Sequence, residues 1–276
     1  MWQNVAVYIS LTRIIPIRIN QGSSINMTSK TAGVIIIGNE ILSGRTQDSN
    51  LAYIAKKLEQ LGIILAEAIV IPDIEAVIIE KVTNYSERFD YVFTTGGIGP
   101  THDDITAASM AKAFNTKLVR NAEAVACMEH YYSPGNLTEA RLRMADIPDG
   151  AVLVDNPVSG PPGFQLKNVF VLAGVPDIMQ GMLDGLSDRL VGGKPILTAS
   201  VSTNLTESRI AEGMGKIQEQ SQEVSIGSYP YFKHGKLGVN VVLRSIDKPL
   251  LLKQHDLIVQ LIRDTGGKVF DINIPG

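Results

Sequence analysis

The chain has 276 residues, of which 45% are hydrophobic and 19% charged, and its formal net charge at pH 7 is −3. This composition predicts a globular protein with one large and one smaller domain, and it excludes a disordered chain. The single cysteine, Cys127, excludes an intrachain disulfide and a multi-thiolate zinc site, and we expect it to be a small buried side chain. Lys and Arg are not in excess, so no nucleic-acid partner is expected.

The first 26 residues contain no acidic side chain, and Arg13 and Arg18 interrupt their apolar stretches. No apolar run approaches the ~20 residues that span a bilayer, so no membrane partner is expected. The segment also lacks the charge order of a secretion signal, which favours a cytoplasmic protein. Because Met27 stands just before the first predicted strand, we predict that residues 1–26 lie upstream of the native start and treat residues 1–30 as an extension.

The first elements alternate strand and helix. Residues 32–37 form a short β-branched run typical of a strand buried on both faces, and it ends at Gly38. A helix follows, with Asp48 or Ser49 as its N-cap and Gly62 as its end. A strand over residues 63–71, a helix opened by Pro72 and Asp73, and a strand over residues 91–95 come next. This alternation predicts parallel strands joined by right-handed crossovers.

A helix from about Asp104 to Phe114 is predicted next, with Asp103 or Asp104 as its N-cap. Two more strands, at residues 151–155 and 169–172, flank a loop rich in Gly and Pro. The fold class is therefore α/β, a mostly parallel sheet sandwiched by helices in a three-layer, Rossmann-like domain over residues 31–191. Composition changes after Gly192, and residues 195–276 predict a smaller C-terminal α+β domain.

The loop after the strand at residues 91–95 is the first candidate site. Glycines at three of four positions let backbone N–H groups approach a ligand, and the following helix N-terminus favours an anion, so the loop predicts a phosphate site. A tight turn without ligand is the alternative. Asp103 and Asp104 would repel an anion unless a cation such as Mg²⁺ joined them. The residues expected to bind ligand here are Thr95, Gly96, Gly97, Gly99, Pro100 and Thr101.

The loop after the first strand is the second candidate, and it has an acidic and polar composition. Either acid alone could be a cap or a solvated side chain, but both loops follow strands whose ends should meet at one sheet edge. We therefore expect them to converge. The residues expected to contribute are Gly38, Glu40, Asp48, Ser49 and Asn50.

His102 is the histidine that lies within a candidate site. Its side chain could exchange protons or bond a phosphate, or it could simply brace the loop. His130, His234 and His255 form no ligand spacing, and we expect them on the surface. The loop at residues 156–163 is either a rigid connection or the wall of a base or pterin pocket, in which case Gly163 contacts ligand.

The two candidate loops together resemble the CinA-type competence/damage-inducible proteins. The resemblance rests on Gly38-x-Glu40-Ile41-Leu42-x-Gly44 with Asp48-x-Asn50, and on Thr94-Thr95-Gly96-Gly97-Ile98-Gly99-Pro100-Thr101-x-Asp103-Asp104-x-Thr106. It extends through residues 156–164 and Gly174-Val175-Pro176. It implies a MoaB/Mog-like molybdopterin-binding domain. Full-length members also have a C-terminal nicotinamide-mononucleotide amidohydrolase domain, which we do not expect in this chain.

The resemblance implies a metal-dependent pyrophosphatase acting on ADP-ribose-like dinucleotides. Asp48, His102 and Asp104 are the expected catalytic residues, and Asp103 and Asp104 the expected metal ligands. The expected cofactor is divalent, Mg²⁺ or Co²⁺, with K⁺ as a further candidate. The alternatives are a molybdopterin-binding or adenylyl-transferring protein of molybdenum cofactor synthesis, and a non-catalytic nucleotide-sensing module. The expected partners are a nucleotide or pterin-phosphate and further copies of the chain, as a dimer or trimer.

Overall fold

The computed structural model describes residues 30–233 and 236–275. The predicted extension over residues 1–26, and His234, lie outside these ranges. The described chain divides into two compact units, and the boundary along the chain falls between Gly193 and Lys194.

The first unit is built on a six-stranded sheet of order β2-β1-β3-β8-β7-β6. The first four of these strands are parallel, whereas β7 is antiparallel to both β8 and β6. The predicted parallel sheet is confirmed, but β7 was not predicted because it begins inside the loop rich in Gly and Pro. The bounds are β1 (Thr31–Ile37), β2 (Ile64–Ile71), β3 (Tyr91–Thr95), β6 (Val152–Val154), β7 (Gly163–Leu166) and β8 (Val169–Leu172).

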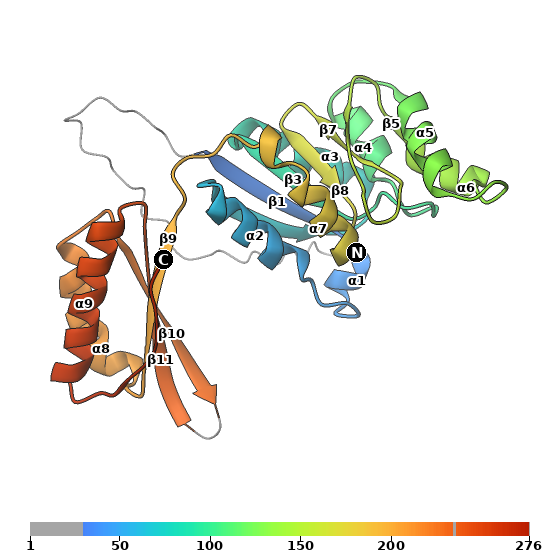
Figure 1. The fold of residues 1–276 in the computed structure, drawn as a ribbon. Coiled ribbons are helices and arrows are strands. Elements are labelled where there is room, and N and C mark those ends of the chain that lie inside the picture. Colours follow the sequence, from blue (N-terminus) through green and yellow to red (C-terminus); the bar gives the residue numbers. More distant parts are fainter. Residues whose placement is uncertain (1–29, 234–235, 276) are drawn as a thin grey trace, which may run out of the picture. The chain divides into compact units, whose positions relative to one another are not determined.

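Helices cover both faces of this sheet (Figure 1). Side chains alternate along β1, so that Val34 and Ile36 join one core while Ile35 and Ile37 join the other. The first core contains α2 (Asn50–Gln60) and α7 (Pro176–Asp184); the second contains α3 (Glu75–Arg88) and α4 (Thr106–Ala113). Burial on both faces explains why β1 has no polar alternation. The predicted three-layer arrangement is confirmed.

A smaller substructure is inserted between α4 and β6. It comprises β4 (Leu118–Arg120), α5 (Ala122–Tyr131), α6 (Glu139–Leu142), η1 (Arg143–Ala145) and β5 (Asp146–Pro148). Arg120 pairs with Asp146 and Glu139, which raises the pKa of its guanidinium. The buried residues of α5 are Ala124 and Met128, one turn apart, so Cys127 faces solvent. The expectation of a buried cysteine was wrong.

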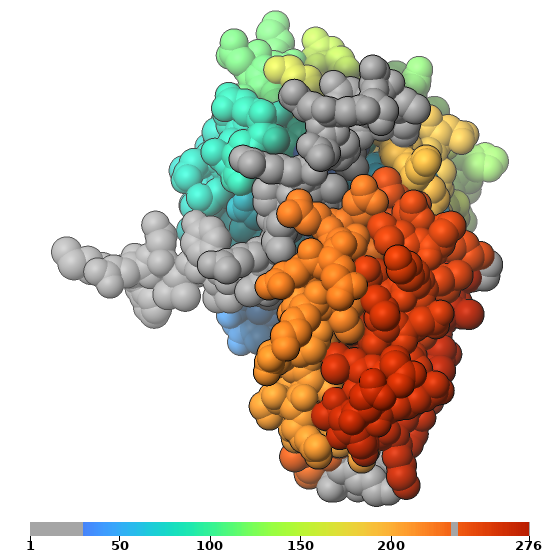
Figure 2. All heavy atoms as spheres, turned by 90° about the vertical axis from the view of Figure 1, so that its left-hand side faces the viewer, coloured from blue at the N-terminus to red at the C-terminus, as the bar shows by residue number. Residues whose placement is uncertain are grey.

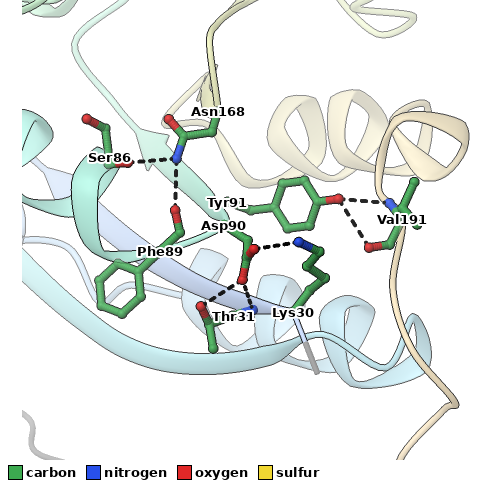
Figure 3. A network of polar contacts seen from close by, with 8 residues as sticks. All are labelled: Lys30, Thr31, Ser86, Phe89, Asp90, Tyr91, Asn168 and Val191. Atoms are coloured by element: carbon green, nitrogen blue, oxygen red, sulfur yellow. Dashed lines mark hydrogen bonds and ion pairs between the residues drawn. The ribbon is translucent and has the colours of Figure 1, made fainter. Parts of the chain in front are cut away.

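Both ends of the first unit are anchored beside β3 (Figure 3). The Tyr91 hydroxyl donates to the carbonyl of Val191 at 3.1 Å and accepts from the Val191 N–H at 3.0 Å. Asp90 accepts hydrogen bonds from Lys30 and from the Thr31 backbone. The start of β1 and the segment after the short helix η2 (Ser187–Arg189) are therefore both fixed near the amino end of β3.

The second unit has a four-stranded antiparallel sheet of order β10-β11-β9-β12, with two helices packed on one face. The chain order βαββαβ with this strand order is the split βαβ arrangement of ferredoxin-like folds. Figure 2 shows the unit as closely packed spheres in orange and red. The predicted α+β domain is confirmed. Its elements are β9 (Leu197–Thr203), α8 (Glu207–Glu219), β10 (Ser225–Lys233), β11 (Lys236–Ser245), α9 (Lys248–Asp264) and β12 (Val269–Asn273).

One expectation for the second unit was wrong, and one of its strands was not predicted. His255 was expected on the surface, but it is 3% exposed because it shares the buried face of α9 with Leu251 and Ile258. The strand β12 was not predicted, since its residues alternate irregularly and the pairing with β9 contains a register shift. Within residues 30–233 and 236–275, no helix combines the length and apolar character needed to cross a membrane.

Candidate functional site

The two candidate loops start from neighbouring strand ends. β1 and β3 pair in parallel register up to Ile36 and Thr95, so the chain leaves both strands at the same edge of the sheet. Gly96 has φ +101°, and a Cβ there would lie 2.1 Å from the carbonyl oxygen of Ile37. Only glycine permits this contact between the two loop backbones.

The glycine loop, residues 96–99, is closed by the first residue of α4. The Thr106 hydroxyl donates to the carbonyl of Gly96, and the Thr106 N–H donates to that of Gly97, both at 3.0 Å. Gly97 has φ +69°, and a Cβ there would meet the Thr106 hydroxyl at 2.2 Å. The expected helix start at Asp104 was wrong, because the chain becomes helical only at Thr106.

Asp103 and Asp104 brace the loop and do not cap the helix, contrary to expectation. The Thr101 hydroxyl lies 2.5 Å from a carboxylate oxygen of each, and the Thr101 N–H donates to Asp104 at 2.8 Å. The hydrogen bond from Thr101 lowers the pKa of the Asp103 carboxyl, so Asp103 is ionised at neutral pH. The two carboxylates thus converge on one hydroxyl.

This pair fits the expected divalent ion in part. Hard cations accept carboxylate oxygens, and Mg²⁺ commonly keeps several waters beside one or two carboxylates and substrate phosphates. Across the described ranges, no group of three or more His, Cys, Asp or Glu side chains could hold a metal ion. Asp103 and Asp104 could therefore bind an ion only together with water or phosphate oxygens.

One pocket lies on the side of the sheet covered by α2 and α7. We call it the acceptor pocket, because each of its polar side chains has an oxygen that can accept a hydrogen bond. No Lys, Arg or His is among the described residues that line it. Together with the open solvent at its mouth its empty volume is about 350 Å³, and its lining consists of Ile36, Ile37, Glu40, Ile41, Thr46, Gln47, Asp48, Ser49, Asn50, Thr95, Gly174 and Pro176.

Two polar side chains position the wall of the acceptor pocket. Ser49, one of the two predicted N-caps, occupies the N-cap position of α2 without a side-chain bond, and the carboxylate of Asp48 just before it accepts a hydrogen bond from the N–H of Leu51 at 3.0 Å. The side-chain amide of Asn50 donates to the carbonyl of Gly174 at 2.8 Å, which joins the start of α2 to the loop after β8. The ends of β1 and β3 and the loop after β8 thus contribute to one pocket.

A second pocket, the arginine pocket, lies beyond the glycine loop. Arg143 donates to the carbonyl of Pro100 at 2.9 Å and supplies the positive charge of this pocket. Together with the open solvent at its mouth its empty volume is about 290 Å³, and its lining consists of Gly97, Ile98, Gly99, Asp104, Ala107, Arg143, Met144, Asp146, Ile147, Pro162 and Phe164. The glycine loop itself contributes Gly97, Ile98 and Gly99 to this lining, whereas Thr95, just before the loop, lines the acceptor pocket.

The predicted site residues divide between the two pockets. Glu40, Asp48, Ser49, Asn50 and Thr95 line the acceptor pocket, and Gly97, Gly99 and Asp104 line the arginine pocket. Asp48 and Asp104, the expected catalytic pair, therefore line different pockets. The other predicted residues line neither pocket: they are Gly38, Gly96, Pro100, Thr101, His102, Asp103 and Gly163.

Some of these outliers have an evident structural role. Gly163 begins β7, and a Cβ there would lie 2.4 Å from the carbonyl oxygen of Val171, so close strand packing explains this glycine. His102 and Thr101 are exposed on the loop. Arg143 was missed by sequence reasoning, because it lies far along the chain on η1 and has no motif. Gly174 entered the sequence analysis only as part of the family resemblance, and it was not among the expected ligand-binding residues.

Comparison with known proteins gives two family matches. Residues 33–192 match the model described as a probable molybdopterin binding domain, and residues 195–265 match the middle domain of FAD synthase. A protein of Archaeoglobus fulgidus is 37% identical over 197 residues, which cover 71% of this chain and 84% of that protein.

Two named relatives are longer. A CinA-like protein of Syntrophus aciditrophicus is 33% identical over 76% of this chain and 53% of its own length. A probable FAD synthase of Caenorhabditis briggsae is 31% identical over 74% of this chain and 44% of its own length. The chain thus spans about half of each.

Among solved structures, the protein CinA from Thermoplasma acidophilum, described as of unknown function, is similar with a TM-score of 0.54. It is 35% identical, and the match covers 58% of this chain and 98% of that one. These similarities support a role in binding a nucleotide or a pterin. The chain belongs to the family of probable molybdopterin binding domains, as a CinA-type member with a MoaB/Mog-like fold.

Proposed function

We propose that the protein is a metal-dependent pyrophosphatase that hydrolyses ADP-ribose-like dinucleotides. The proposal rests chiefly on one observation: Thr95, just before the glycine loop, lines the pocket that holds Asp48, and Gly97 and Gly99 of the loop line the pocket that holds Asp104. A dinucleotide has the matching form, since a central pyrophosphate joins two larger end groups. Its phosphates would lie along the glycine loop, where backbone N–H groups and Arg143 can balance their charge.

Hydrolysis adds water across the phosphoric anhydride. The water oxygen forms a bond to one phosphorus, the bridging P–O bond breaks, and the water proton passes to a base or to the leaving phosphate. A divalent ion, when bound, would neutralise charge and lower the pKa of its water. Asp103 and Asp104 would hold this ion with substrate oxygens. Asp48 lines the acceptor pocket, so it would position the water or accept its proton only where that pocket adjoins the glycine loop, beside Thr95.

Product analysis tests this proposal. Purified protein is incubated with ADP-ribose, with and without Mg²⁺, Co²⁺ or K⁺, and the products are separated. FAD and molybdopterin complete the panel, because relatives are described as a probable FAD synthase and as probable molybdopterin binding domains. We expect metal-stimulated release of AMP and ribose 5-phosphate. Recovery of every dinucleotide unchanged, with molybdopterin retained, would contradict hydrolysis and favour the cofactor-binding role.

A further inference from the structure

Two residues that line the acceptor pocket each have a buried polar atom without a hydrogen-bond partner in the described part of the chain. These atoms are Oδ1 of Asn50, whose residue is 4% exposed, and Oγ1 of Thr95, whose residue is 1% exposed. Buried polar groups in folded proteins are nearly always paired, because an unpaired one loses its bonds to water without replacement. Two such atoms at one pocket therefore indicate partners supplied by a ligand.

The orientation of Asn50 is fixed by its other bond. The Gly174 carbonyl can only accept, so the Asn50 atom that lies 2.8 Å from it must be the amide nitrogen. The amide oxygen is thereby left as an acceptor for a donor in the pocket. Thr95 is the last residue of β3, and its hydroxyl can accept as well as donate.

The charges around the pocket select the kind of ligand group. Glu40 and Asp48 add carboxylates to these two atoms, and no cationic side chain is among the described lining residues. The two carboxylates would repel a phosphate, and no cation among the described lining residues offsets that repulsion. Hydroxyl or amino groups would meet the acceptors they need.

We propose that the acceptor pocket is the subsite for the uncharged, donor-bearing nucleoside part of the substrate, bonded by Asn50 and Thr95. This assignment rests on the proposed nucleotide function, and it fixes the direction in which a dinucleotide binds: nucleoside in the acceptor pocket, phosphates on the glycine loop. The donors could be the ribose hydroxyls or the amino group of the base, and substrate analogues separate these sources.

Thr94 provides a matched control. It neighbours Thr95 on β3, is 0% exposed, and its hydroxyl also has no partner in the described chain. Because successive strand residues point to opposite faces, Thr94 lies on the other side of the sheet, and it lines neither pocket. Valine has nearly the shape of threonine, so Thr95→Val and Thr94→Val each remove one unpaired hydroxyl without opening a cavity.

The test measures AMP affinity by isothermal titration calorimetry, and the melting temperature of the free protein, for wild type, Thr95→Val, Thr95→Ser and Thr94→Val. We expect Thr95→Val to bind AMP about tenfold more weakly, while its melting temperature stays the same or rises. Thr95→Ser should bind nearly as wild type does, and Thr94→Val should match wild-type affinity. A purely structural role for the Thr95 hydroxyl would instead lower the melting temperature.

Analogues of AMP then identify the donor. They are the 2′-deoxy and 3′-deoxy nucleotides and purine riboside monophosphate, which lacks the amino group. The analogue that lacks the group bonded by Thr95 should bind wild type weakly, and its affinity should not fall further in Thr95→Val. The subsite alone would be overturned if Thr95→Val bound AMP as tightly as wild type does. It would also be overturned if Thr95→Val lost the same factor of affinity for AMP and for every analogue. Failure of wild type to bind AMP would overturn both the subsite and the nucleotide function.

Discussion

The side-chain amide of Asn50 bonds the carbonyl of Gly174, a residue 124 positions further along the chain. This bond joins the beginning of α2 to the loop that leaves β8. Asn50→Asp keeps the shape of the side chain but places an acceptor opposite the Gly174 carbonyl. We expect the free energy of unfolding to fall by roughly 1–3 kcal/mol, the cost of an unpaired buried polar group. Urea denaturation measures it, and unchanged stability would show that the bond does not form.

The glycine loop depends on a residue without a side chain at position 97. Gly97→Ala combines a left-handed backbone with a Cβ 2.2 Å from the Thr106 hydroxyl. Gly150 is the control, since its φ is +80° but nothing lies within 4 Å of a Cβ there. We expect about 1–2 kcal/mol of destabilisation for Gly150→Ala, and distinctly more for Gly97→Ala. Equal losses in thermal denaturation would mean that Thr106 can move aside.

The Tyr91 hydroxyl anchors the end of the first unit by two hydrogen bonds to Val191 (Figure 3). Tyr91→Phe removes both and leaves the ring in place. Because Val191 is 69% exposed, water can replace the lost partners, and we expect a loss of about 0.5–1.5 kcal/mol. Hydrogen exchange at the amide of Val191 should accelerate in the variant. An unchanged exchange rate would contradict the anchoring role.

Asp184 links α7 to α2 by accepting from Lys57 and from the Tyr53 hydroxyl, both at 2.8 Å. The bond from Lys57, followed by that from Tyr53, lowers the pKa of Asp184 from its ordinary value of 3.8. A lowered folded-state pKa stabilises the fold above the unfolded value and stops doing so as the pH falls through the folded one. Wild type should therefore exceed Asp184→Asn in stability at pH 7, and this difference should close below about pH 4.

The side chain of Asp184 is half exposed, so solvent screening limits the expected difference at pH 7 to about 1 kcal/mol or less. Urea denaturation of both proteins between pH 3 and pH 7 measures it. A difference that stays constant over this range would show that the charge of Asp184 does not contribute.

Local sequence patterns predict the central elements of the fold well. β1 is an uninterrupted apolar run because both of its faces are covered, and α2 places Ile54 and Leu58 on one buried face between Asp48 and Gly62. The strand β7 was missed because Gly163 and its neighbours have the composition of a turn, and only pairing with β8 makes them a strand.

The candidate site was less predictable, because its decisive contacts join distant residues. The start of α4 is held by the hydrogen bond from the N–H of Thr106 to the carbonyl of Gly97, whereas the sequence predicted a cap from an aspartate. Arg143 reaches Pro100 only through the packing of the inserted substructure. The unpaired oxygen of Asn50 becomes visible only once Gly174 is known to hold the amide nitrogen.

The central claim is hydrolysis at the glycine loop with Asp104 as a metal ligand, and the metal-stimulated rate of ADP-ribose hydrolysis in Asp104→Asn tests it most directly. Asp149→Asn is the control, because Asp149 is exposed and lines neither pocket. Removing the charge of Asp104 should lower the stimulated rate at least a hundredfold, about 2.7 kcal/mol of transition-state stabilisation, while Asp149→Asn stays near wild type. A wild-type rate in folded Asp104→Asn would contradict the account.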